Sequence, residues 1–184
     1  MKRAALAVAV TLALGLVSGR AKAELPQKPN VISHKPFALT SSGITVQYER
    51  ALGRRWSVLA GLGERRAAQM DFSSHTETFV SEGRYWLSGR DWATGFQGIA
   101  GPYLSLAVDA GRTSVTSVHG DRWLGAIWTV QESFRFGNRF VFWDLQEVSV
   151  AVSIDTIHEF DEKGRLAPNT RGTIGADFTV GWVF

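Results

Sequence analysis

Apolar and polar residues alternate one by one along most of the chain, which is the pattern of β-strands with two unlike faces. The last stretch, residues 173–184, shows it most clearly. Its odd-numbered residues are mostly small or polar, whereas its even-numbered residues form a continuous apolar face that ends in aromatic rings. That apolar face consists of Ile174, Ala176, Phe178, Val180, Trp182 and Phe184. The stretch therefore predicts a strand that is apolar on one side.

The same alternation recurs along the chain and predicts seven strands, at residues 43–52, 56–65, 77–87, 103–110, 126–136, 140–154 and 173–184. An eighth strand is expected at residues 28–34. Pro29 and Pro36 limit its length, because proline cannot donate a ladder hydrogen bond, so we place it at the seam of a closed sheet. Eight is an even number, as bacterial single-chain membrane barrels require.

The connections alternate between short and long. Residues 52–56 and 136–140 each contain a glycine and predict tight hairpins, whereas residues 66–76, 111–121 and 155–170 are long and polar. Short periplasmic turns and long external loops are typical of outer-membrane barrels. Residues 88–97 would also be periplasmic, although they are longer than this layout expects. The start of the 140–154 strand is ambiguous and is compatible with a β-bulge.

The polar faces of these strands hold mainly Gly, Ser, Thr, Ala and isolated acids, which suits the crowded inside of a small barrel. Aromatic residues gather near the predicted periplasmic ends and suggest a membrane girdle. They are Tyr48, Trp56, Tyr85, Phe134, Phe136, Phe140, Phe142, Trp182 and Phe184. A soluble β-sandwich is the alternative, but its core gives no reason for aromatic rings at one end. We predict an all-β, eight-stranded antiparallel up-and-down transmembrane β-barrel in the cell outer membrane.

The chain of 184 residues is long enough for one domain after a leader is removed. Residues 1–23 have a basic start, an apolar stretch at residues 4–17 and the triplet Ala21-Lys22-Ala23, which predict a secretory signal peptide. Residues 24–184 would form the barrel domain. Cleavage removes four basic residues and no acidic ones, so that 16 basic and 17 acidic side chains remain. This near-neutral balance argues against nucleic-acid binding.

The chain has no cysteine, which excludes disulfides, thiolate metal sites, a thiol nucleophile and a lipoprotein anchor.

Two features resemble known outer-membrane proteins. The apolar face of Phe178, Val180, Trp182 and Phe184 resembles the terminal signal that the barrel-assembly machinery reads during biogenesis. The motifs YERAL at 48–52, RWS at 55–57 and EGRYW at 82–86 resemble those of a family of uncharacterised small outer-membrane β-barrel proteins of the OmpA/OmpX-like type. This second resemblance covers roughly residues 30–110. It implies a fold and a location, and it implies no activity.

Several charged residues fall on the polar faces and are expected inside the barrel, namely Glu49, Glu82, Arg84, Asp109, Glu147 and Asp177. Carboxylates in such a narrow interior must be paired or hydrated. Arg84 is the one strongly placed cation by this reading, and it could bridge Glu49 and Glu82. We favour a polar plug that fills the lumen; a proton or ion pathway and a substrate site are the alternatives. No cofactor is expected.

Further polar residues fall in or beside the predicted external loops. The four histidines, His34, His75, His119 and His158, could form a metal site only by convergence, because no two have a chelating spacing. Six arginines lie at the predicted outer strand ends, namely Arg65, Arg66, Arg112, Arg122, Arg165 and Arg171. They could pair with lipopolysaccharide phosphates or simply keep the loops soluble. Outer-membrane lipids and lipopolysaccharide are therefore the expected partners.

An enzymatic role has weak support. Residues 156–160 faintly resemble the His-x-Ser neighbourhood of barrels that deacylate lipid A, but Phe160 occupies the serine position and cannot be a nucleophile. Ser73 and Ser74 beside His75 are a common coincidence in a polar segment. We expect a non-catalytic protein with an envelope-structural or surface-interaction role through its external loops. A lipid A-modifying enzyme and a narrow channel are the alternatives, and the sequence identifies no specific ligand.

Overall fold

The computed structural model describes residues 30–35, 42–53, 55–68, 70–87, 100–117, 123–143, 145–165 and 170–184. The predicted signal peptide and the first two residues of the strand expected at 28–34 lie outside these ranges. The described residues form eight strands: β1 (Asn30–His34), β2 (Ser42–Ala51), β3 (Trp56–Ala68), β4 (Phe72–Trp86), β5 (Gly101–Ser117), β6 (Trp123–Phe142), β7 (Gln146–Phe160) and β8 (Arg171–Val183).

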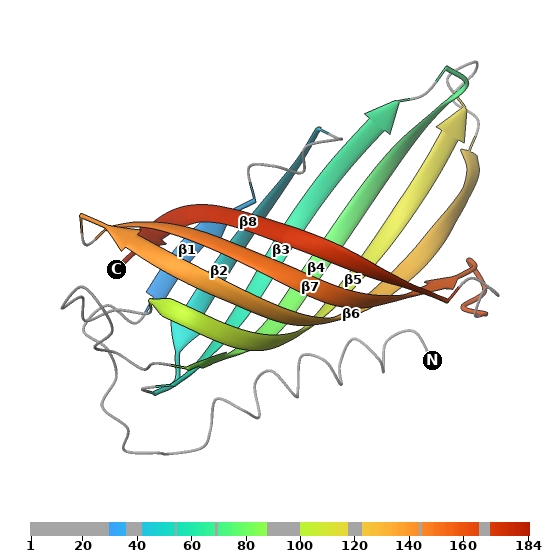
Figure 1. Cartoon of the computed structure of the whole chain (residues 1–184). Coiled ribbons are helices and arrows are strands. Elements are labelled where there is room, and N and C mark those ends of the chain that lie inside the picture. Colours follow the sequence, from blue (N-terminus) through green and yellow to red (C-terminus); the bar gives the residue numbers. More distant parts are fainter. Residues whose placement is uncertain are drawn as a thin grey trace.

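Each strand is antiparallel to the next, and β1 pairs with both β2 and β8, so that the sheet closes into a barrel (Figure 1). At the seam, the backbone of Asn30 and that of Phe184 exchange two hydrogen bonds of 3.0 and 2.9 Å. The predicted all-β, eight-stranded up-and-down barrel is confirmed, including the short first strand. No helix in the described ranges is long and apolar enough to cross a membrane.

The two ends of the barrel differ. We call the end with the β2–β3 and β6–β7 connections and Phe184 the turn end, and the opposite end the loop end. The hairpin predicted at residues 52–56 is present, with the Leu52 amide donating to the Trp56 carbonyl at 2.8 Å. Trp143, which has a left-handed backbone (φ 51°), lies in the β6–β7 turn.

The hairpin predicted at residues 136–140 is wrong. Strand β6 runs through this segment to Phe142, so that β7 begins at Gln146 rather than near 140. Gly137 is in register with Tyr103 on β5, and a Cβ on Gly137 would lie only 2.4 Å from Cζ of the Tyr103 ring. The glycine therefore makes room for an inward-facing ring and does not form a turn.

The long polar loops predicted at 66–76, 111–121 and 155–170 are also partly wrong, because the strands extend into them. The connection between β3 and β4 is only residues 69–71, and β5 and β7 continue to Ser117 and Phe160. Hydroxyl pairs join β4 to β5 here, with Ser73 2.7 Å from Thr116 and Thr76 2.9 Å from Thr113. These strand ends carry mostly polar side chains on both faces, and they lack the regular alternation from which a strand is predicted.

Apolar side chains cover the outside of the barrel and polar side chains fill its inside, which is the reverse of the distribution in a soluble protein. The outer surface carries large apolar residues that are widely exposed, such as Leu106 (69%) and Ile174 (83%). Of the aromatic residues expected to form a girdle, Tyr48, Trp56, Phe134, Phe136, Phe140, Phe142, Trp182 and Phe184 are exposed, and Tyr85 is half-buried. The interior instead buries serine, glutamate and arginine, beside a small apolar cluster of Val31, Ala51, Trp86, Tyr103, Ala151 and Val183.

Candidate functional site

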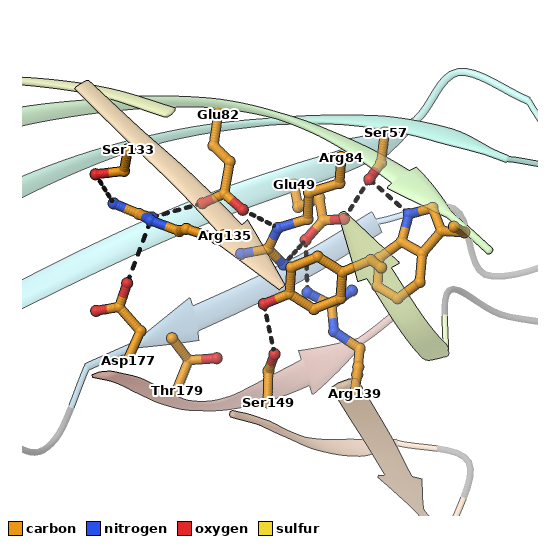
Figure 2. A network of polar contacts seen from close by, with 12 residues as sticks. Glu49, Ser57, Glu82, Arg84, Ser133, Arg135, Arg139, Ser149, Asp177 and Thr179 are labelled. Atoms are coloured by element: carbon orange, nitrogen blue, oxygen red, sulfur yellow. Dashed lines mark hydrogen bonds and ion pairs between the residues drawn. The ribbon is translucent and has the colours of Figure 1, made fainter. Parts of the chain in front are cut away.

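The interior is filled by a network of charged side chains that come from most of the strands. Because side chains alternate between faces, each strand sends every second residue inward. Figure 2 shows the central members pointing toward one another across the lumen. The charged members are Lys35, Glu49, Glu82, Arg84, Asp109, Arg135, Arg139, Glu147 and Asp177, which makes four cations and five anions.

Arg84 on β4 lies at the centre of this network. Its Nε is 2.6 Å from Oε1 of Glu82, and its Nη1 is 2.7 Å from Oε2 of Glu49 on β2. The guanidinium also lies over the ring of Tyr103, 4.6 Å from the ring centroid. All three charged groups are buried. The bridge from Arg84 to both glutamates, expected from the sequence, is present.

Arg139 on β6 closes the network toward the turn end. Its Nη2 contacts the same Glu49 oxygen at 2.5 Å, and its Nε lies 2.9 Å from Oε2 of Glu147. The guanidinium is 5.0 Å from the ring of Trp86, whose indole N–H donates to Ser57. Ser57 in turn donates to Glu49. The Arg139–Glu49 ion pair, the Trp86 ring and the Ser57 hydroxyl therefore contact one another.

Arg135, also on β6, extends the network toward the loop end. Its Nη1 is 2.8 Å from Glu82, its Nη2 is 3.1 Å from Asp109, and its Nε is 3.4 Å from Asp177. Asp177 on β8 also accepts from Nζ of Lys35, which follows β1, at 2.8 Å. A continuous chain of ion pairs thus runs from Lys35 to Glu147.

The six charged residues predicted to line the lumen all lie inside the barrel, together with three cations that the prediction does not include, Lys35, Arg135 and Arg139. Treating Arg84 as the one strongly placed cation is wrong, because Arg135 and Arg139 are equally buried. The alternation through Phe134 and Phe136 already places Arg135 on the inner face. The hairpin predicted at 136–140 places Arg139 in a turn rather than on an inner face. Lys35 follows a strand that is too short to show an alternating pattern.

The loop-end margin of the network is less tightly packed. The side chains of Asp109 and Asp177 are partly exposed, unlike the glutamates. A cavity of about 10 Å³, room for about one water molecule, borders Lys35, Gln47 and Asp177, together with Arg84, Tyr103, Arg135, Ser149 and Thr179. Gln47 is 1% exposed, and neither polar atom of its amide has a protein hydrogen-bond partner in the described part of the chain.

The candidate metal and catalytic residues are dispersed. His34 stacks with Trp182 at 6.4 Å, Nε2 of His75 is 3.1 Å from Glu64, and Nδ1 of His158 lies 3.3 Å from the Thr170 hydroxyl. His119 lies outside the described residues. Among the residues that the structure describes, no three or more histidines and acids are grouped to hold a metal ion.

The serines beside His75 have other partners. The Ser73 hydroxyl forms its hydrogen bond with Thr116, and that of Ser74 lies 3.5 Å from the Ala67 carbonyl oxygen. Phe160, the last residue of β7, stands where the deacylase pattern has a serine.

The arginines at the loop end differ in their partners. Arg66 lies 2.7 Å from Glu64, Arg165 2.7 Å from Asp161, and Arg171 3.5 Å from Glu159. Asp161 also accepts the backbone N–H groups of Arg165 and Lys163, and these bonds, together with the Arg165 side chain, hold the pKa of Asp161 below its ordinary value. Arg112 instead lies beside two tryptophan rings, those of Trp123 and Trp128. Arg122 lies outside the described residues, and Arg65 is exposed.

The residues of the expected assembly signal lie on the outer face of β8 and at its end. Trp182 and Phe184 are about half exposed, while Phe178 and Val180 are less so. Recognition by the assembly machinery stays a prediction.

These features define an eight-stranded antiparallel β-barrel with a charged, filled interior and an apolar outer surface. Among solved structures, this chain is similar to the N-terminal β-barrel domain of Pseudomonas aeruginosa OprF. The match has a TM-score of 0.49 and 10% sequence identity, and it covers 84% of this chain and 95% of that one. No family model and no curated protein matches the sequence. Membership of the family of uncharacterised small outer-membrane barrels therefore stays a prediction.

Proposed function

We propose that this chain is a non-catalytic integral protein of the outer membrane, with an envelope-structural or surface-interaction role through its external loops. The observation that carries the proposal is the inverted distribution of side chains on a closed ladder. Large apolar residues cover the outside and charged residues fill the inside. In water, such an apolar surface would drive aggregation, whereas in a bilayer it contacts acyl chains.

The backbone supports the same environment. Nothing in the hydrocarbon core can hydrogen-bond a free peptide group, so a sheet can cross it only as a closed barrel. The described strands close in this way through β1 and β8. The predicted leader and the aromatic C-terminal strand favour the outer membrane, with the barrel-assembly machinery as a partner during biogenesis. The turn end would then face the periplasm and the loop end the outside.

The state of the lumen supports a structural role rather than transport or catalysis. The guanidinium groups of Arg84, Arg135 and Arg139 are each engaged by at least two carboxylates. Eight strands enclose an interior just wide enough for side chains. Opening a path for solutes would require separating buried ion pairs, at about 3–5 kcal/mol for each one broken. We therefore expect a closed plug.

The location is tested by fractionation and gel migration of the full chain. A membrane barrel should sediment with outer membranes and migrate differently before and after boiling, and external protease should cut it only at loop-end connections. A protein found in the periplasmic fraction, with one migration position, would contradict the proposal.

Two further measurements test the role. We expect no conductance above leak in planar bilayers, because the lumen is filled. We also expect the same lipid A species in cells carrying the natural chain and in cells carrying His158→Ala. Stable single-channel steps would favour a channel, and a change in lipid A acylation would favour an enzyme.

A further inference from the structure

Arg112 lies on the outer surface of the barrel beside two indole rings. It points outward from β5, and Trp128 on β6 is its cross-strand partner. The centre of its guanidinium lies 5.8 Å from the Trp128 ring and 5.9 Å from the Trp123 ring. We call these three residues the Trp–Arg–Trp cluster.

An irregularity in the ladder brings Trp123 into this cluster. The register between β5 and β6 shifts between Val115 and Thr116, and Gly125 on the opposite strand has a positive φ of 143°. After the shift, Trp123 pairs with Thr116. Such an irregularity re-aims the side chains that follow it. Both indoles remain about half exposed, at 48% for Trp123 and 41% for Trp128.

The cluster lies where the apolar outer surface ends. From the turn end, the outward residues of β5 are apolar as far as Ala110, and Arg112 is the next one. On β4, the outward residue Glu77, which is the cross-strand partner of Arg112, likewise follows the outward ring of Phe79. With the barrel in a membrane, as proposed above, this boundary lies at the depth of the lipid headgroups, where tryptophan is favoured.

The donors of Arg112 are available to a ligand. Arg66, Arg165 and Arg171 each lie beside a carboxylate, whereas the described residues place no carboxylate within ion-pair distance of Arg112. Contact with ring faces leaves the N–H groups at the edge of a guanidinium free to donate. Glu77 on β4 is the cross-strand neighbour of Arg112 on the other side and is the nearest competing anion in the register.

We propose that the Trp–Arg–Trp cluster binds a phosphate group of lipid A in the outer leaflet. The planar guanidinium fork matches two phosphate oxygens, which makes the interaction bidentate. The two indole faces can pack against the apolar C–H faces of the phosphorylated sugar, a surface that a glycerophospholipid lacks. The inference rests on the proposed outer-membrane location and adds to it a defined ligand and site.

The test measures binding of purified lipid A to the full chain in detergent micelles by native mass spectrometry. Diphosphorylated lipid A is compared with the dephosphorylated form and with phosphatidylglycerol. We expect the diphosphorylated form to bind best. Arg112→Gln should weaken its binding about tenfold, through loss of the charged bidentate contact. Trp123→Leu should weaken it by a smaller factor.

Two variants serve as matched controls. Arg66→Gln removes an outward arginine that already has a carboxylate partner, and it should change binding less than about twofold. Glu77→Gln removes the competing anion and should strengthen binding roughly twofold. Equal binding of dephosphorylated lipid A, equal binding of phosphatidylglycerol, or unchanged binding by Arg112→Gln would each overturn the proposal.

Gel migration before and after boiling is recorded for every protein in this series. A variant that keeps the natural heat-dependent shift is folded, so its loss of binding is a local effect. If the natural chain shows the shift but binds no lipid A, the site is refuted while the membrane barrel stands. If it shows no shift, the barrel proposal fails first.

Discussion

Tyr103 on β5 and Gly137 on β6 face each other in the ladder, and the tyrosine ring occupies the space that a side chain at position 137 would need. The ring is buried, its hydroxyl lies 3.1 Å from the Ser149 hydroxyl, and the Arg84 guanidinium rests on its face. One glycine thus allows an aromatic ring to link the wall of the barrel to its charged interior.

Replacing this glycine should destabilise the barrel. In Gly137→Ala, the new Cβ would lie 2.4 Å from Cζ of Tyr103, so the ring must move away from Ser149 and Arg84. We expect the free energy of unfolding to fall by about 1–3 kcal/mol, the usual cost of overpacking. Urea unfolding in lipid vesicles measures it. Gly83→Ala is the matched control, because a Cβ there meets nothing within 4 Å. Equal losses in the two variants would refute the role of the ring.

Removing one arginine from the network should cost more than removing one at the surface. Arg139→Met leaves Glu49 and Glu147 buried without this partner, so the free energy of unfolding should fall by about 3–5 kcal/mol. Adding Glu147→Gln to Arg139→Met should recover part of the loss, because one uncompensated charge is then removed. Arg66→Gln, at an exposed pair, should unfold like the natural chain. The idea fails if Arg139→Met and Arg66→Gln have the same midpoint.

The β6–β7 turn contains a strained residue. Trp143 has a φ of 51°, a conformation that costs a residue with a side chain about 1 kcal/mol and costs glycine very little. Trp143→Gly should therefore be more stable than Trp143→Ala by about that amount, as measured by urea unfolding. Both variants lack the 82%-exposed indole, so their difference isolates the backbone. A glycine variant no more stable than the alanine variant would show that the turn is unstrained.

The segment that follows β7, residues 161–165, should loosen in acid. The backbone and side-chain hydrogen bonds from Arg165 hold the pKa of Asp161 below its ordinary value of 3.8. A carboxyl whose folded pKa is depressed stabilises its surroundings above the unfolded pKa and loses this effect as the pH falls through the folded pKa. Protease cleavage near residues 161–165 should thus increase below about pH 3.8. Cleavage by an acid-tolerant protease is compared with that in Asp161→Asn, which should show no such dependence. The same acid-induced increase in both proteins would exclude Asp161 as the cause.

The fold and the orientation of most strands follow from the sequence, because one period-two signal fixes both the strand and its inner face. The alternation places Glu49, Glu82 and Arg84 in the lumen in this way, and the structure has them there. The strand limits at the loop end could not be predicted, since Ser73, Thr76, Thr113 and Thr116 pair through hydroxyl groups and carry no apolar face.

The sequence predicts which face of a strand a charged residue lies on better than it predicts which ion-pair partner that residue has. Lys35 and Asp177 are 142 residues apart in sequence and meet only because the barrel closes. The turn predicted at Gly137 is wrong because a glycine between alternating residues indicates a turn as readily as close packing. Only the position of Tyr103 across the ladder distinguishes the two, and that position depends on the register of β5 against β6.

The reciprocal hydrogen bonds between Asn30 and Phe184 can form only after the last strand has been synthesised, so they constrain when the barrel can close. The five-residue strand β1 is the first of the eight strands in the chain, yet one of its two neighbours, β8, is the eighth. Before β1 and β8 pair, a partly formed sheet has unpaired strand edges and an exposed apolar face. Pairing between segments far apart in sequence is slow, so we expect the pairing of β1 with β8 to be the slowest step of barrel closure.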